Sequence, residues 1–81
     1  MRNLILLLDE MIKLIPSDND HKIFKNDIIK VRDQASFTAP EQILNKWNEA
    51  QYEISKYFES MDKLPEWGLA FINLWTNRQD K

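Results

Sequence analysis

Residues 43–61 read ILNKWNEAQYEISKYFESM, and the apolar side chains in this stretch recur at alternating intervals of four and three residues. The repeating set consists of Ile43, Trp47, Ala50, Ile54, Tyr57 and Met61. Because an α-helix turns once every ~3.6 residues, this spacing places the whole set along one side of a helix. Helices with one such apolar side pack nearly parallel or antiparallel to one another in bundles. The stretch therefore predicts a long bundle helix.

The same spacing recurs in three other segments of the chain. These are Met1, Leu4, Leu8, Met11 and Ile15; Phe24, Ile28, Val31 and Ala35; and Leu64, Trp67, Phe71 and Leu74. Four such segments in 81 residues predict an all-α fold, a small antiparallel four-helix bundle formed by residues 1–81 as a single helical domain. A three-helix bundle with a peripheral C-terminal helix is the alternative. No stretch alternates with a period of two, so no β-hairpin is expected.

Turn-forming residues separate the first two helices. Pro16 cannot continue a helix, so the first helix is expected over residues 2–15. Ser17, with Asp20 three residues later, matches a variant of the capping box, in which two side chains satisfy free amides at a helix start. This pair predicts a second helix over residues 18–34.

Two further signals place the last two helices. Thr38 and Glu41 form another capping box, with Pro40 in the first turn, where a missing amide proton costs nothing. They predict that the longest helix starts within one residue of Thr38. Pro65 is expected to open the fourth helix, over residues 65–77, for the same reason as Pro40.

Composition narrows the range of functions. The chain has no cysteine, one histidine, one glycine and a net charge of −2. The missing cysteines exclude disulfides and thiolate chemistry, and one glycine cannot form a glycine-rich phosphate loop. The apolar run after Arg2 stops at Asp9, which is too short for a signal peptide or a membrane span. We therefore expect a cytoplasmic protein that does not enter membranes, and the abundant Lys, Ile and Asn favour a bacterial or phage source.

Candidate metal ligands are few and poorly arranged. His21 lies near Asp18 and Asp20, but a transition-metal site needs several ligands and no second histidine is present. A helix-capping turn explains these residues better. Glu49 and Glu53 lie one helical turn apart on the side opposite the apolar residues, interleaved with lysines, which is typical of a solvated face. We therefore expect no metal, no cofactor and no catalytic residues.

A nucleic-acid interface is the weaker of two binding hypotheses. The second helix carries four basic residues, Lys22, Lys25, Lys30 and Arg32. Asp27 and Asp33 interrupt them, and a helix that contacts phosphates needs a continuous positive surface. A dimeric nucleic-acid-binding regulator that uses this patch is kept as the alternative function, although the net charge disfavours nucleic acid.

Apolar residues in excess of the bundle seams are the strongest functional signal. The first helix is apolar over about half its circumference, which favours deep burial. The fourth helix carries a second stripe, Gly68, Ile72 and Trp75, beside its seam, and Leu69 on another side. Gly68 costs about 1 kcal/mol of helix stability relative to alanine, which a close approach by another backbone would explain. The stripe predicts an exposed protein-binding surface formed by Leu69, Ile72, Trp75 and Gly68; alternatively, Trp75 closes the end of the bundle.

These features favour a non-enzymatic protein-binding module. It would act stoichiometrically, as an inhibitor, an immunity-type factor or a regulator, by docking an aromatic and aliphatic helical surface onto another protein or onto a second copy as a homodimer. Tryptophan supports this hypothesis because it buries a large area at low entropic cost and is enriched at interface hot spots.

Overall fold

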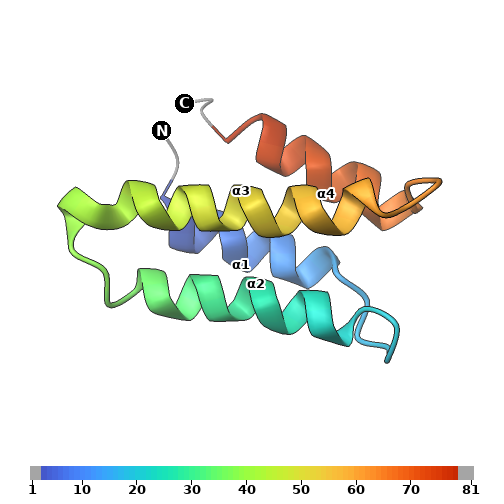
Figure 1. Ribbon diagram of the computed structural model, residues 1–81, viewed down its shortest axis with the longest axis horizontal. Helices are drawn as coiled ribbons and strands as arrows, with labels where there is room; N and C mark the ends of the chain where they lie inside the picture. Colours follow the sequence, from blue (N-terminus) through green and yellow to red (C-terminus); the bar gives the residue numbers. More distant parts are fainter. Residues whose placement is uncertain (1–2, 79–81) are drawn as a thin grey trace.

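The computed structural model describes residues 3–78, which form four α-helices and one short 3-10 helix, with no strand among them. The elements are α1 (Leu4–Leu14), α2 (Lys22–Ala35), η1 (Pro40–Gln42), α3 (Ile43–Glu59) and α4 (Glu66–Thr76). Each helix runs antiparallel to the next along the chain, and η1 leads directly into α3 (Figure 1). The predicted fold class, a small helical bundle, is confirmed.

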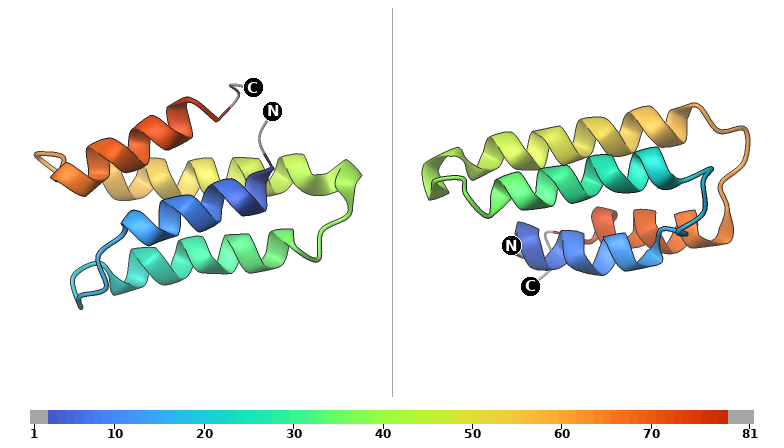
Figure 2. Two further views of the ribbon diagram at one scale, coloured as in Figure 1. Left: turned by 180° about the vertical axis from the view of Figure 1, so that it is seen from behind. Right: turned by 90° about the horizontal axis from the view of Figure 1, so that it is seen from below.

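The four helices form two layers, with α2 and α3 in one and α1 and α4 in the other (Figure 2). The backbone of α1 lies close to both α2 and α4, and the backbone of α2 lies close to α3. The backbones of α3 and α4 do not approach each other as closely, so side chains bridge this side of the bundle. The first of the two predicted alternatives is the one observed, because α4 packs on α1 and buries Phe71 and Trp75 in the core, although its side toward α3 is partly open.

The core follows most of the predicted seam positions in the first three helices; Ile43, Tyr57 and Met61 are only half-buried, and Met1 lies outside the described residues. The apolar side chains of α2 that share one side, Phe24, Ile28, Val31 and Ala35, are all buried. The buried residues of α1 are Leu4, Leu7, Leu8 and Met11, and those of α3 are Trp47, Ala50 and Ile54. Because α1 packs against both α2 and α4, it buries a wider side than a single seam. This explains why α1 has more apolar residues than one seam requires.

The buried line of α4 differs from the predicted seam. Gly68, Phe71 and Trp75 are buried, whereas Trp67 and Leu74 are half-buried. Leu64, predicted as a seam residue, precedes the helix and is exposed. The predicted second stripe therefore supplies two of the three buried positions, because α4 turns the edge between its two stripes toward the core.

Two of the predicted helix caps are wrong. The Thr38 hydroxyl donates to the Gln34 carbonyl at 2.7 Å, so it closes the C-terminal end of α2 instead of starting the next helix. Helical structure begins at Pro40 after Ala39, with no capping side chain, and α3 begins at Ile43. Capping pairs are local signals, and here the Thr38 hydroxyl bonds instead to a carbonyl in the last turn of the preceding helix, which also accepts the Phe37 amide.

The turn before α2 also differs from the prediction. Asp18, and not Ser17, accepts the backbone amide of His21, at 3.1 Å, and α2 begins only at Lys22. The Ser17 hydroxyl instead accepts a hydrogen bond from the Lys25 ammonium group at 2.7 Å.

The sequence pattern did not predict the N-terminal cap of α1. The Asn3 side-chain oxygen accepts from the amides of Ile5 and Leu6, at 2.9 and 3.2 Å. We expect Asn3→Ala to lower the free energy of unfolding by about 1 kcal/mol, since the amides of Ile5 and Leu6 lose their partner. Thr38→Ala should cost less than about 0.5 kcal/mol because its bond is exposed. Urea unfolding of both variants measures the difference, and equal losses would contradict this assignment of the caps.

Core truncation should be costly at the predicted seam positions. Phe71 and Ile54 are 0% and 2% exposed. Phe71→Ala should lower the free energy of unfolding by about 3–5 kcal/mol and Ile54→Ala by about 2–5 kcal/mol, through lost burial and the cavity left behind. Leu6→Ala is the matched control, since Leu6 is an exposed leucine on α1, and it should change stability by less than about 0.5 kcal/mol. Tolerance at both core positions would contradict the packing described above.

Candidate functional site

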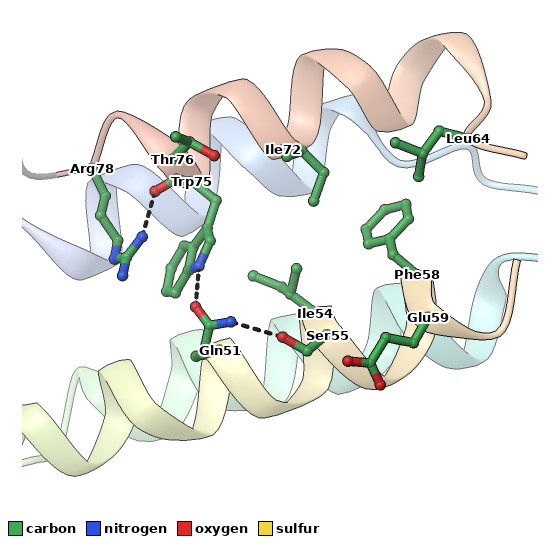
Figure 3. Close-up of a pocket in the computed structure, with 10 residues that line it drawn as sticks. All are labelled: Gln51, Ile54, Ser55, Phe58, Glu59, Leu64, Ile72, Trp75, Thr76 and Arg78. Atoms are coloured by element: carbon green, nitrogen blue, oxygen red, sulfur yellow. Dashed lines mark hydrogen bonds between the residues drawn. The ribbon is translucent and has the colours of Figure 1, made fainter.

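An apolar groove of about 540 Å³ opens to solvent between α3 and α4 (Figure 3). Its apolar lining consists of Ile54 and Phe58 on α3, Leu64 in the link, and Ile72 and Trp75 on α4. Its polar lining consists of Gln51, Ser55, Glu59, Thr76 and Arg78. The groove lies on the side where the two helix backbones are not in close contact, so it follows directly from the way α4 packs on α1.

Gly68 determines how close α4 lies to α3 at one end of the groove. A Cβ atom at Gly68 would lie 3.1 Å from Cε1 of Phe58 and 3.1 Å from Cδ of Pro65. The predicted close approach at this glycine is therefore made by an aromatic ring of α3 and the preceding proline ring, and not by another backbone. The ring of Phe58 in turn lies 5.6 Å from that of Phe71, centroid to centroid.

Trp75 bridges α4 and α3 at the other end of the groove. Its indole N–H donates to the Gln51 side-chain oxygen at 2.6 Å, and its ring lies 5.6 Å from the ring of Trp47. Only 5% of Trp75 is exposed, so the prediction that it belongs to an exposed patch is wrong. The alternative, that this residue closes the end of the bundle, describes its position, because the large ring fills the space between two helices.

Two of the four predicted binding residues are accessible. Ile72 is half-buried on the groove wall between Trp75 and Leu64 (Figure 3). Leu69 is 55% exposed and lies outside the groove lining, three residues before Ile72 on the same helix. Gly68 is buried, so it shapes the site without presenting a contact surface.

Charged side chains lie at opposite ends of the groove. Arg78 donates from Nη1 to the Trp75 carbonyl at 2.9 Å and its guanidinium lies 4.5 Å from the center of the Trp75 ring. Glu59 lies near Phe58, at the end of α3 (Figure 3). Within the part of the chain that the structure describes, neither charge has an ion-pair partner of opposite sign.

The candidate metal ligands have structural roles. The Nδ1 atom of His21 lies 2.5 Å from the Asp18 carboxylate, and its ring packs edge-on against Trp67 at 5.3 Å. The hydrogen bond from His21 holds the pKa of the Asp18 carboxyl below its ordinary value. Across residues 3–78, no three histidine, aspartate or glutamate side chains come together as a metal site.

The solvated face predicted for the α3 carboxylates holds for Glu49, whose side chain is 49% exposed, but not for Glu53, whose side chain is only 21% exposed. Glu49 lies 3.0 Å from the Lys46 ammonium group, and Glu53 lies 3.6 Å from that of Lys56. Burial raises the pKa of the neighbouring Tyr57 hydroxyl, and nearby aspartate charges add to the shift.

The basic residues of α2 are divided among other contacts. Arg32 donates to Asp9 of α1 at 2.7 Å and to Asp33 at 3.1 Å, and these hydrogen bonds raise the pKa of its guanidinium. Lys25 is bound to Ser17. Only Lys22 and Lys30 of the predicted patch are exposed. The patch therefore offers fewer free cations than the sequence suggests.

Comparison with known proteins gives no relative: no protein family, no curated protein and no solved structure matches this chain. In residues 3–78, none of the helices combines the length and the apolar character that crossing a bilayer requires.

Trp75 should contribute mainly to folding stability. Trp75→Ala removes a buried ring and its hydrogen bond to Gln51, so we expect the free energy of unfolding to fall by about 3–5 kcal/mol. Thermal and urea unfolding of the isolated chain measure this loss. Leu69→Ala on the same helix is the control and should change stability by less than about 0.5 kcal/mol, because Leu69 is more than half exposed. If Trp75→Ala left the free energy of unfolding unchanged, this would contradict a role of Trp75 in stabilising the fold.

Proposed function

We propose that this chain is a non-enzymatic protein-binding module, which acts stoichiometrically as an inhibitor, an immunity-type factor or a regulator of another protein. The observation that carries the proposal is the open apolar groove between α3 and α4. Pockets that bind partners are concave and mainly apolar, with a few polar groups that orient the bound segment. The groove has this composition, with Gln51, Ser55 and Thr76 among its polar lining.

The shape of the groove favours a helical segment of the partner as the bound element. The lining residues of α3 extend from Gln51 to Glu59, which spans about 12 Å along a helix axis at ~1.5 Å per residue. A helix laid along this length presents two to three apolar anchors at intervals of three and four residues. Ile72 and Leu64 would contact these anchors, and Leu69 would extend the contact beyond the groove.

Binding through this surface would bury side chains that the bundle leaves partly exposed. Leu64 is 37% exposed and Leu69 is 55% exposed. Covering such apolar area contributes about 25 cal/mol per Å² removed from water. No charged residue of the groove is needed for this contribution, so apolar docking should depend weakly on salt.

Capture of a partner from extracts of the source cells tests the proposal. The bait proteins are the unmodified chain, Ile72→Asp, Leu69→Asp and the control Leu6→Asp, which places the same charge on an exposed leucine of α1. A carboxylate in the groove, or on the apolar surface beside it, must be desolvated on binding, so Ile72→Asp and Leu69→Asp should weaken the affinity for the captured protein at least tenfold. Leu6→Asp should bind within about twofold of the unmodified chain.

Calorimetry with the purified partner then measures stoichiometry and salt dependence. We expect one partner per chain and little change in affinity between 50 and 300 mM salt. Equal binding by all four baits would contradict the use of the groove. An affinity that falls steeply with salt, or capture that depends on nucleic acid, would favour the alternative nucleic-acid-binding function at Lys22 and Lys30.

A further inference from the structure

We infer that, without its partner, the groove between α3 and α4 binds a second copy of this chain in a two-fold symmetric dimer. This inference rests on the proposed function, because both use the groove as a protein-docking surface. It adds that a second copy of the chain occupies the groove. As a consequence, binding of the partner protein and self-association exclude each other.

The charges at the ends of the groove carry the inference. Glu59 lies at one end, beside Phe58, and Arg78 lies at the other, beside Trp75 (Figure 3). A two-fold axis that lies in the interface and crosses the middle of the groove, at right angles to the line between Glu59 and Arg78, brings each end of one copy against the opposite end of the other. Glu59 of one copy then meets Arg78 of the partner copy, and the symmetry repeats this pair. A groove with like charges at both ends would repel its own copy in this arrangement.

Neither charge has a counter-ion among residues 3–78. Within the described residues Glu59 makes no ion pair or hydrogen bond, and Arg78 uses one donor on a backbone carbonyl. A guanidinium has five N–H donors in a planar fork, so Arg78 keeps donors for a carboxylate of a second copy. The surface therefore presents one free acceptor group and one free donor group in complementary positions.

The apolar wall between the charges suits the same symmetry. Ile72 lies near the middle of the wall formed by α4 (Figure 3). A residue close to a two-fold axis contacts its own counterpart, so Ile72 would pack against Ile72 of the second copy. Leu64 would extend this apolar contact on the side of Glu59.

Charge reversal tests the pairs directly. Sedimentation equilibrium over 5 µM to 1 mM measures the dimer dissociation constant of the unmodified chain, Glu59→Arg, Arg78→Glu and the double variant Glu59→Arg/Arg78→Glu. Each single reversal places like charges at both symmetric contacts and should weaken the dimer roughly tenfold. The double variant restores opposite charges in reversed order and should recover the affinity to within about threefold. Lys22→Glu on α2 makes the same change in net charge as Arg78→Glu and should have no effect.

A cysteine crosslink tests the axis without changing either charge. The chain contains no cysteine, so Ile72→Cys introduces one thiol per copy. Two such thiols near a two-fold axis should form an intermolecular disulfide under mild oxidation, or a crosslink with a short bismaleimide. Leu6→Cys, on the exposed side of α1, should crosslink at least tenfold more slowly at the same concentration.

The outcomes separate this inference from the proposed function. A chain that stays monomeric at 1 mM would contradict the dimer. A dissociation constant unchanged by Glu59→Arg and Arg78→Glu would contradict it too, and so would a double variant that does not recover the affinity. If Ile72→Asp still loses the captured partner in that case, the proposed function stands. If the dimer forms through the groove, adding purified partner should dissociate it; a complex of two copies with partner bound in both grooves would contradict mutual exclusion.

Discussion

Two aromatic contacts set the distance between α3 and α4, and the rest of the groove depends on them. At one end Phe58 packs against Gly68 and Phe71; at the other, Trp75 packs against Trp47 and bonds to Gln51. The residues that line the groove between these contacts include Ile54, Ser55 and Ile72, whose side chains are smaller than an aromatic ring. The helices are therefore held apart by large side chains at both ends, and the smaller ones in the middle cannot fill the space. This is a packing constraint, and it explains an open apolar surface in a chain that otherwise buries its seams well.

Phe58 and Phe71 also belong to an aromatic cluster that stabilises the end of the bundle where α2, α3 and α4 meet. Phe24 stacks on Tyr57 with ring centers 4.0 Å apart, and it lies 5.7 Å from Phe58 and 5.6 Å from Phe71. Offset and edge-to-face pairs add to the energy of burial itself. In contrast, the ion pair between Arg32 and Asp9 links α1 and α2 at a partly exposed position, where such pairs contribute little.

The periodicity of the sequence predicts the fold and most of the core because helical burial repeats every three to four residues. Leu8, Phe24, Ile28, Trp47, Ile54 and Phe71 were predicted as core residues and are buried. Helix ends were predicted less well. The Thr38 hydroxyl could bond to an amide at the start of the next helix or to the Gln34 carbonyl at the end of α2. Which of the two it reaches depends on the path of the connection. Asn3 was missed since its effect depends on where α1 starts.

The candidate site was predicted in part. The surplus apolar stripe of α4 pointed to the correct helix, and Ile72 and Leu69 are accessible. The burial of Trp75 could not be predicted, because its partners Trp47 and Gln51 lie 28 and 24 positions away and nothing local encodes that contact. The contribution of α3 to the groove was missed for the same reason. A groove between two helices requires their relative placement, which a single-helix pattern does not contain.

The weak direct contact between the backbones of α3 and α4 has a consequence for the dynamics of the bundle. Because the backbone of α4 lies close mainly to that of α1 and α4 reaches α3 only through side chains near the two ends of the groove, we expect α4 to separate as a unit while α1, α2 and α3 stay packed. Its backbone amides should then exchange with solvent through this partial opening, at a lower free energy than the amides of α1 and α2 require. Any protein seated in the groove touches both α3 and α4 at once. It would close this route and slow amide exchange along the whole of α4, including turns that it does not contact.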